Sequence, residues 1–107
     1  MKPFAIREFL TTSGTNPFRH WLLTLDTKTR ARVQARIFKV ESGNLGSYRS
    51  VGDGIFEFKM DFGPGYRIYF SFIEGETLLL LVGGDKSSQK KDIRKAIRYL
   101  ESYLTGI

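Results

Sequence analysis

Hydrophobic and polar positions along the chain fall into strand-like alternations separated by two helical segments. Alternation over residues 3–9 predicts a first strand. Asn16 followed by Pro17 is a helix-start signal, because asparagine caps a first turn and proline fits the first helical position. The run DTKT then breaks this helix and offers a new cap for a second helix, which runs to about Glu41 and stops at Gly43. So short a connection predicts an antiparallel helical hairpin.

Three further strands are predicted after a glycine-punctuated loop, which itself has room for a short strand. Residues 55–61 (IFEFKMD) alternate strictly, and residues 66–72 (YRIYFSF) alternate again after the turn FGPG. Residues 77–82 (TLLLLV) do not alternate and therefore predict a central strand covered on both faces. After GGDK, we expect Ser87 or Ser88 to cap a last helix that carries one apolar stripe.

The order of these elements predicts one α+β domain over residues 1–107. An N-terminal strand and the helical hairpin precede a mostly antiparallel sheet of three to four strands, and a helix closes the chain. A chain of this length is large enough for one hydrophobic core and too small for two.

The two alternating strands place a polar set on one shared face. Glu57 and Lys59 alternate away from the apolar residues of the first strand, and Arg67 and Tyr69 do so in the second. Because the apolar sets of both strands pack the same way, the polar sets must share the opposite side. We expect these four side chains to lie together on an open sheet surface, with Lys86 at the mouth of the last strand.

Composition narrows the possible partners. The 17 Lys and Arg residues outnumber the 11 Asp and Glu residues and give a formal net charge of +6. The excess is clustered in residues 28–41 and 86–101, which favours a surface for an anionic partner such as nucleic acid, an acidic protein, or both. One histidine and no cysteine exclude a disulfide scaffold, a thiol nucleophile and a histidine-rich metal centre. No apolar run is long enough for a membrane span or a signal peptide, so a cytoplasmic protein is expected.

The polar face suits RNA cleavage without a metal ion. Such a reaction needs activation of a ribose 2′-OH, stabilisation of a charged phosphorane and departure of the 5′-oxygen. The guanidinium of Arg67 matches phosphate oxygens, and Lys59 or Lys86 could act as base or acid. Glu57 is the carboxylate placed to take a proton, and Tyr69 could stack on a base. The alternative is a solvated sheet face on which Glu57 pairs with a neighbouring cation.

Three segments of the sequence resemble a known family. They are GIFEFKMDFGPGYRIYF, LLLLVGGDKSSQKKDIRKA and ARVQARIFKVESGNLG. Together they look like the RelE/ParE toxin superfamily, and most like its addiction-module killer branch, which is similar to HigB. The resemblance covers about residues 17–100 and implies a RelE-like fold.

The resemblance implies the toxin of a type II toxin–antitoxin pair. Such toxins of the RelE and HigB kind cut messenger RNA at the ribosome, without metal or cofactor, and leave a 2′,3′-cyclic phosphate. Carried onto this chain, Arg67 stabilises the transition state and Lys59 is the strand lysine, while Lys86 is the basic residue after the last strand. Gln89 and Lys90 would contact the RNA backbone. Glu57 is the candidate for proton transfer.

The resemblance also implies partners and leaves alternatives. An antitoxin, expected to be a helix-turn-helix protein, would bind the toxin, and Arg32 and Arg36 of the second helix would touch ribosomal RNA. A gyrase inhibitor of the ParE type has the same fold without RNA chemistry. A catalytically inactive module that only binds its antitoxin is the third possibility.

Overall fold

The computed structural model of the chain describes residues 3–106. Its elements, in chain order, are β1 (Ala5–Glu8), α1 (Pro17–Thr24), α2 (Thr27–Glu41), β2 (Arg49–Gly52), β3 (Ile55–Lys59), β4 (Arg67–Ile73), β5 (Thr77–Gly84), the 3₁₀ turn η1 (Lys86–Ser88) and α3 (Gln89–Thr105). The expected α+β order is confirmed, and the short strand for which the glycine-rich loop had room is β2. Within residues 3–106, no helix combines the length and the apolar character that crossing a bilayer requires.

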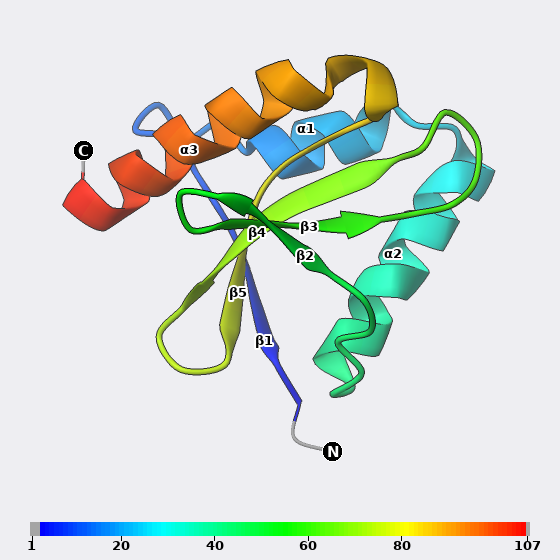
Figure 1. Cartoon of the computed structure of the whole chain (residues 1–107), viewed down its shortest axis with the longest axis horizontal. Coiled ribbons are helices and arrows are strands. Elements are labelled where there is room, and N and C mark those ends of the chain that lie inside the picture. The colour runs from blue at the N-terminus through cyan, green and yellow to red at the C-terminus, as the bar shows by residue number, and fades with distance from the viewer. Residues whose placement is uncertain (1–2, 107) are drawn as a thin grey trace.

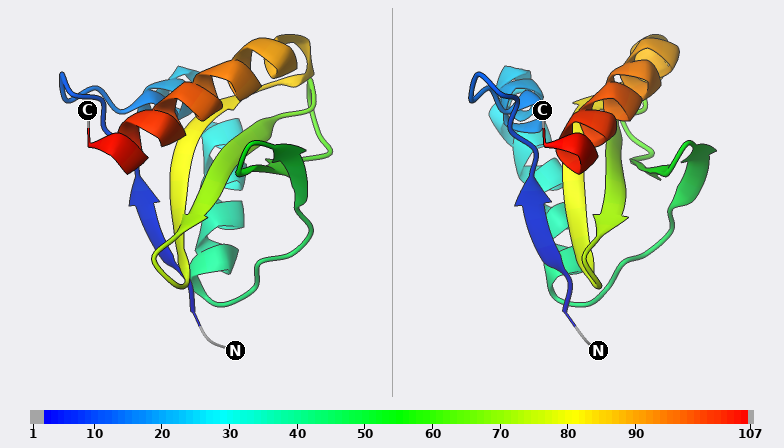
Figure 2. Two further views of the ribbon diagram at one scale, coloured as in Figure 1. Left: turned by 60° about the vertical axis from the view of Figure 1, so that its left-hand side comes forward. Right: turned by 90° about the vertical axis from the view of Figure 1, so that its left-hand side faces the viewer.

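The five strands form one mixed sheet in the order β1-β5-β4-β3-β2. β1 runs parallel to β5, and the other neighbouring pairs are antiparallel. Helices cover both faces: α1 and α2 lie on one side of the sheet, and α3 crosses the other side (Figures 1 and 2). The sheet is therefore the middle layer of three.

Both helices of the hairpin begin where their capping residues stand. The side chain of Asn16 accepts a hydrogen bond from the backbone N–H of Arg19 at 2.9 Å, and that of Asp26 accepts one from Thr29 at 2.7 Å. Each cap satisfies an N–H group that the first helical turn leaves without a partner. These contacts confirm the expected starts of α1 and α2.

The hydrophobic core has two parts, one on each face of the sheet. Phe18 and Leu22 of α1 and Val33 and Val40 of α2 pack on one face, together with apolar residues of β3, β4 and β5. Ala96 and Leu100 of α3 pack on the other face. β5 contributes to both parts and is buried along nearly its whole length, as its unbroken apolar run predicted.

The expected open sheet surface is not open, because α3 covers much of it. Tyr69 lies on that face and is fully buried, and Glu57 and Arg67 are 1% and 5% exposed. The physical reason is the apolar stripe of α3, which is buried by packing against the second face of the sheet. Alternation in the strands defines two faces without showing which of them a later helix will cover.

Candidate functional site

A polar hollow of about 380 Å³ opens where β2, β3 and β4 run side by side. Its lining includes Tyr48, Arg49, Glu57, Lys59, Asp61 and Arg67. Three of these side chains are cations and two are carboxylates. The hollow is therefore suited to an anionic group rather than to a neutral one.

The strand register brings these side chains together. Lys59 of β3 lies directly opposite Arg67 of β4, and Glu57 lies opposite Tyr69. On its other side, Glu57 lies opposite Arg49 of β2. The expected shared face is confirmed, and β2 adds one arginine to it.

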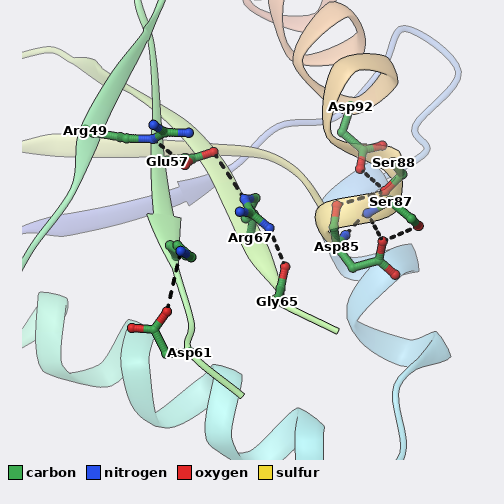
Figure 3. A network of polar contacts seen from close by, with 10 residues as sticks. Arg49, Glu57, Asp61, Gly65, Arg67, Asp85, Ser87, Ser88 and Asp92 are labelled. Carbon is green, nitrogen blue, oxygen red and sulfur yellow. Dashed lines mark hydrogen bonds and ion pairs between the residues drawn. The ribbon is translucent and has the colours of Figure 1, made fainter. Parts of the chain in front are cut away.

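The carboxylate of Glu57 lies between two guanidinium groups (Figure 3). Arg49 Nε donates a hydrogen bond to Glu57 Oε1 at 2.6 Å, and Arg67 Nε lies 3.7 Å from Glu57 Oε2. Arg67 Nη1 donates in addition to the carbonyl of Gly65 at 2.7 Å. The guanidinium of Arg67 is thus held by one hydrogen bond to the Gly65 carbonyl and by a longer ion-pair contact with Glu57.

The turn before β4 brings Lys86 to the same place. The backbone N–H of Lys86 donates to the carbonyl of Pro64 at 3.3 Å, which ties η1 to the turn. Gly65 has a positive φ of 77°, and a Cβ added there would lie 3.2 Å from Arg67 Nη1 and 3.6 Å from the Cβ of Lys86. Glycine is therefore the residue that lets Arg67 and Lys86 approach each other. The side chain of Lys86 is exposed.

Lys59 supplies an exposed ammonium group across from Arg67. Its side chain is 57% exposed, and its Nζ lies 3.8 Å from a carboxylate oxygen of Asp61, whose side chain is 86% exposed. An ion pair between two such exposed groups is weak, so Lys59 can turn toward an anion in the hollow.

Three of the expected site residues are buried: Tyr69 and Glu57 have no accessible side chain, whereas Arg67 keeps 6% of its side-chain surface exposed. Tyr69 is fully buried beneath α3, so its ring offers no face to a base, and its hydroxyl has no hydrogen-bond partner in the described part of the chain. Burial and the negative charges of Glu57 and Asp92 raise the pKa of Tyr69. Glu57 has no exposed side-chain surface, which argues against proton transfer to or from a substrate.

The two arginines expected on the second helix differ in what they do. Arg36 is half-buried: its Nη2 donates to the carbonyls of Leu45 and Ser47 at 2.8 and 3.2 Å, and its guanidinium lies 4.3 Å from the ring centre of Phe58. It therefore holds the loop before β2 rather than facing a partner. Arg32 is exposed and lies 3.6 Å above the ring of Phe62.

Cationic surfaces continue on both sides of the hollow. A shallow depression over α2, of about 380 Å³, is lined by Arg32, Lys39, Lys59 and Asp61 among others. It shares Lys59 and Asp61 with the hollow, so the two are continuous. Another depression of about 560 Å³ lies at the start of α3 and is lined by Lys86, Gln89, Lys90, Lys91 and Arg94 together with Ser87 and Ser88. It contains four cations and no carboxylate.

Sequence reasoning missed Arg49, which reaches Glu57 from β2. The segment from residue 42 to residue 54 reads as an irregular loop because glycines punctuate it. The available signal was the spacing: Arg49 precedes Glu57 by eight residues, across a tight turn that contains Gly52 and Gly54. A hairpin centred on those glycines places the two side chains opposite each other.

A separate groove of about 640 Å³ runs between α1 and α3. Aromatic residues such as Trp21, Tyr66 and Tyr99 line it, together with the largely buried carboxylate of Asp92. The Ser88 hydroxyl donates to Asp92 Oδ2 at 2.5 Å. Burial outweighs this hydrogen bond and raises the pKa of Asp92. Across residues 3–106, no three histidine or carboxylate side chains gather into a group that could hold a metal ion.

Comparisons with known proteins place the chain in a family. The sequence model of the family described as phage-derived protein Gp49-like (DUF891) matches residues 20–101. A protein of Haemophilus influenzae, described as an uncharacterized protein, is 46% identical over 83 residues, which cover 77% of this chain and 84% of that protein.

The solved structure of an arginine-to-alanine mutant of E. coli toxin RelE in the free state has a similar fold. The two structures superpose with a TM-score of 0.62 at 13% sequence identity, over 91% of this chain and 97% of the other. At that identity the likeness concerns the fold. The chain thus belongs to the Gp49-like family of phage-derived proteins, and its three-layer α+β architecture is that of RelE.

Proposed function

We propose that the chain is a toxin of the RelE type that cuts messenger RNA without a metal ion. The observation that carries this proposal is the cationic hollow, in which Arg67 donates a hydrogen bond to the Gly65 carbonyl and forms an ion pair with Glu57. Lys59 stands across the strand pair from Arg67, and Lys86 stands at the adjoining turn. The fold shared with RelE and the membership of the Gp49-like family support a toxin role.

In the proposed reaction the protein supplies charge and proton transfer. The ribose 2′-oxygen attacks the neighbouring phosphorus, and its proton passes to a base, for which Lys59 and Lys86 are the accessible candidates. Arg67 donates to the phosphorane oxygens as their negative charge grows. The bond to the 5′-oxygen then breaks, that oxygen takes up a proton, and a 2′,3′-cyclic phosphate remains.

The proposal includes two partners. Phosphate contacts by exposed cations on either side of the hollow, such as Arg32 and Lys90, would hold the toxin on ribosomal or messenger RNA without sequence reading. A cognate antitoxin would bind the toxin and suppress its activity.

Translation in a cell-free extract tests the proposal. We would add the wild-type chain, the Arg67→Ala variant and the Arg98→Ala variant, and map message ends by primer extension. Arg98 is exposed on α3, outside the hollows described above, so its loss is the matched control. We expect the wild type and the control to cut translated message, and the Arg67→Ala variant to lose about 100-fold or more in rate.

Other outcomes assign a different function. If the wild type leaves both message and protein yield unchanged, the ribonuclease proposal is wrong, and DNA gyrase is the next target to assay. If it cuts message in the absence of translation as fast as in its presence, the ribosome is not required. Cutting by the Arg67→Ala variant at the wild-type rate would remove Arg67 from the reaction.

A further inference from the structure

Two arginines of the hollow contact Glu57, and they differ in exposure: Arg67 is the inner one and Arg49 the outer one. The side chain of Arg67 is 6% exposed, whereas that of Arg49 is 63% exposed. Both meet the same fully buried carboxylate, one at each oxygen. The outer guanidinium is therefore the one that an incoming anion meets first.

We propose that Arg49 binds a phosphate of the RNA substrate, and that Glu57 is a positioning residue that orients Arg49 and Arg67 rather than a proton acceptor. The proposal rests on the proposed function, because it assigns roles within the same hollow. It adds a substrate-contacting residue that neither the sequence pattern nor the family resemblance indicated.

The geometry of the Arg49 contact leaves its donors available. Arg49 meets Glu57 through Nε alone, so the two terminal nitrogens of the guanidinium are outside this hydrogen bond. Arginine binds phosphate through a planar fork of such donors. Because the Nε contact fixes the plane of the group, little side-chain freedom remains to be lost when an anion binds.

A second arginine–glutamate pair in the same chain shows the contrast. Arg19 meets Glu8 through both Nε and Nη2, so its fork is occupied by the carboxylate itself. That pair joins α1 to β1 and is outside the hollow. Arg49 contacts its carboxylate through one nitrogen, so its guanidinium is available to a ligand. Arg19 contacts its carboxylate through two nitrogens, so its guanidinium is used to join two elements.

Burial makes Glu57 unsuitable as a base and suitable as an anchor. A proton acceptor has to come within hydrogen-bond distance of the 2′-OH, about 2.6–3.2 Å. The side chain of Glu57 has no exposed surface, and an arginine stands at each oxygen. A buried carboxylate is tolerated where opposite charges compensate its lost hydration, and here both compensating groups line the hollow.

The contact with Arg67 is also incomplete. Arg67 Nε and Glu57 Oε2 are both buried, lie 3.7 Å apart, and neither has a hydrogen-bond partner in the described part of the chain. A small rotation of Arg67 toward its neighbour would complete that bond.

Binding of an uncleavable RNA tests the inference apart from the reaction. A short 2′-O-methyl RNA lacks the attacking hydroxyl, so its affinity reports the hollow alone. We would measure the Kd of this RNA by fluorescence anisotropy at several salt concentrations. The proteins compared are the wild type and the Arg49→Ala, Arg49→Lys, Glu57→Gln and Arg19→Ala variants. Arg19→Ala is the control, since it removes the same charge and an ion pair elsewhere.

We expect Arg49→Ala to weaken binding about tenfold and to lower the slope of log K against log salt by about 0.7, the value for one phosphate contact on a single strand. Arg49→Lys should restore the salt slope but only part of the affinity, because lysine lacks the Nε contact and the fork. Arg19→Ala should bind like the wild type. Unchanged affinity and slope in Arg49→Ala, or no RNA binding by the wild type, would overturn the proposal.

Glu57→Gln distinguishes a positioning residue from a base. If Glu57 is a positioning residue, the Glu57→Gln variant should bind RNA more weakly and should show shifted Arg49 and Arg67 Nε–H signals in the ¹⁵N–¹H spectrum. The shape of its pH–rate profile should be that of the wild type. If Glu57 is instead the base, the variant should bind RNA like the wild type but lose one limb of the pH–rate profile. That result would contradict our assignment. If the wild type binds through Arg49 but never cuts message, the phosphate site stands and the ribonuclease proposal fails.

Discussion

The carboxylates of Glu57 and Asp92 are buried and that of Glu8 is partly buried, and each is compensated differently. Glu57 lies between two arginines, Glu8 accepts from one arginine and one asparagine, and Asp92 accepts from a single serine hydroxyl. The pKa shifts of Glu8 and Asp92 follow their hydrogen-bond partners. Burial alone raises a carboxyl pKa. The hydrogen bonds from the charged Arg19 and the neutral Asn16 outweigh that effect at Glu8, whereas the one from Ser88 does not at Asp92.

The Glu8 pair predicts how stability depends on pH. Although burial opposes it, hydrogen bonds from Arg19 and Asn16 hold the pKa of Glu8 below its ordinary 4.5. A carboxyl with a lowered folded-state pKa stabilises the fold above its ordinary pKa, and this contribution is lost as the pH falls. We expect Glu8→Gln to reduce the free energy of unfolding at pH 7 and to have a smaller effect near pH 3, as measured by urea denaturation.

The exposed Glu101→Gln variant on α3 is the control for that measurement, and it should show little effect at either pH. A destabilisation by Glu8→Gln that is equal at both pH values would contradict the pairing. It would mean that the variant acts through packing rather than through charge.

At the scale of elements, the end of β5 depends on two glycines that allow side chains to touch the sheet. A Cβ at Gly83 would lie 2.1 Å from the ring of Trp21, and one at Gly84 would lie 1.8 Å from Asp92 Oδ2. Neither contact is possible without movement. The groove between α1 and α3 exists in its present form because both positions lack a side chain.

We expect Gly83→Ala to destabilise the protein by about 1–3 kcal/mol, the usual cost of overpacking. A rigid indole ring has to move in Gly83→Ala, and Gly84→Ala has to displace the hydrogen-bonded pair of Asp92 and Ser88, so we expect both to destabilise the protein. Urea midpoints measure the destabilisation, and the fluorescence of the one tryptophan reports the displaced ring. Equal midpoints for the wild type and Gly83→Ala, with unchanged emission, would contradict the close approach.

The elements also show what the sequence could and could not predict. Caps at Asn16 and before α2, and strict alternation in β3 and β4, are local signals, so the starts of α1 and α2 and the shared strand face were predictable. Ser88 does precede α3, but its side chain makes no capping hydrogen bond and donates to Asp92 instead. The burial of Tyr69 was not predictable in this way, because it depends on where α3 packs, and that packing is a contact between segments distant in the sequence. Arg49 was missed because its partner lies across a hairpin whose glycines resemble a loop.

At the scale of the whole molecule, burial is concentrated in the middle of the sheet. β4 and β5 are covered by helices on both faces and have neighbours on both edges, whereas β2 is an exposed edge strand. The hollow thus joins a well-buried strand to a peripheral one: Arg67 stands on the first and Arg49 on the second.

Hydrogen exchange should reveal this gradient. We expect the amides of β5 from Leu78 to Leu81 to exchange only through global unfolding, and those of β2 to exchange through local fraying at much lower free energy. Mass spectrometry or NMR of the exchanging chain measures both segments in one experiment. Equal protection of β2 and β5 would show that the two strands open as one unit.

The parallel pairing of β1 with β5 has a consequence for synthesis. Residues Ala5–Glu8 find their partners only at Thr77–Leu80, so β1 has no strand to pair with until that later segment has left the exit tunnel. Lys86 emerges later still. A nascent chain from which these segments have not yet emerged therefore lacks both the finished sheet and the cation near Arg67, so the proposed site cannot assemble before they do.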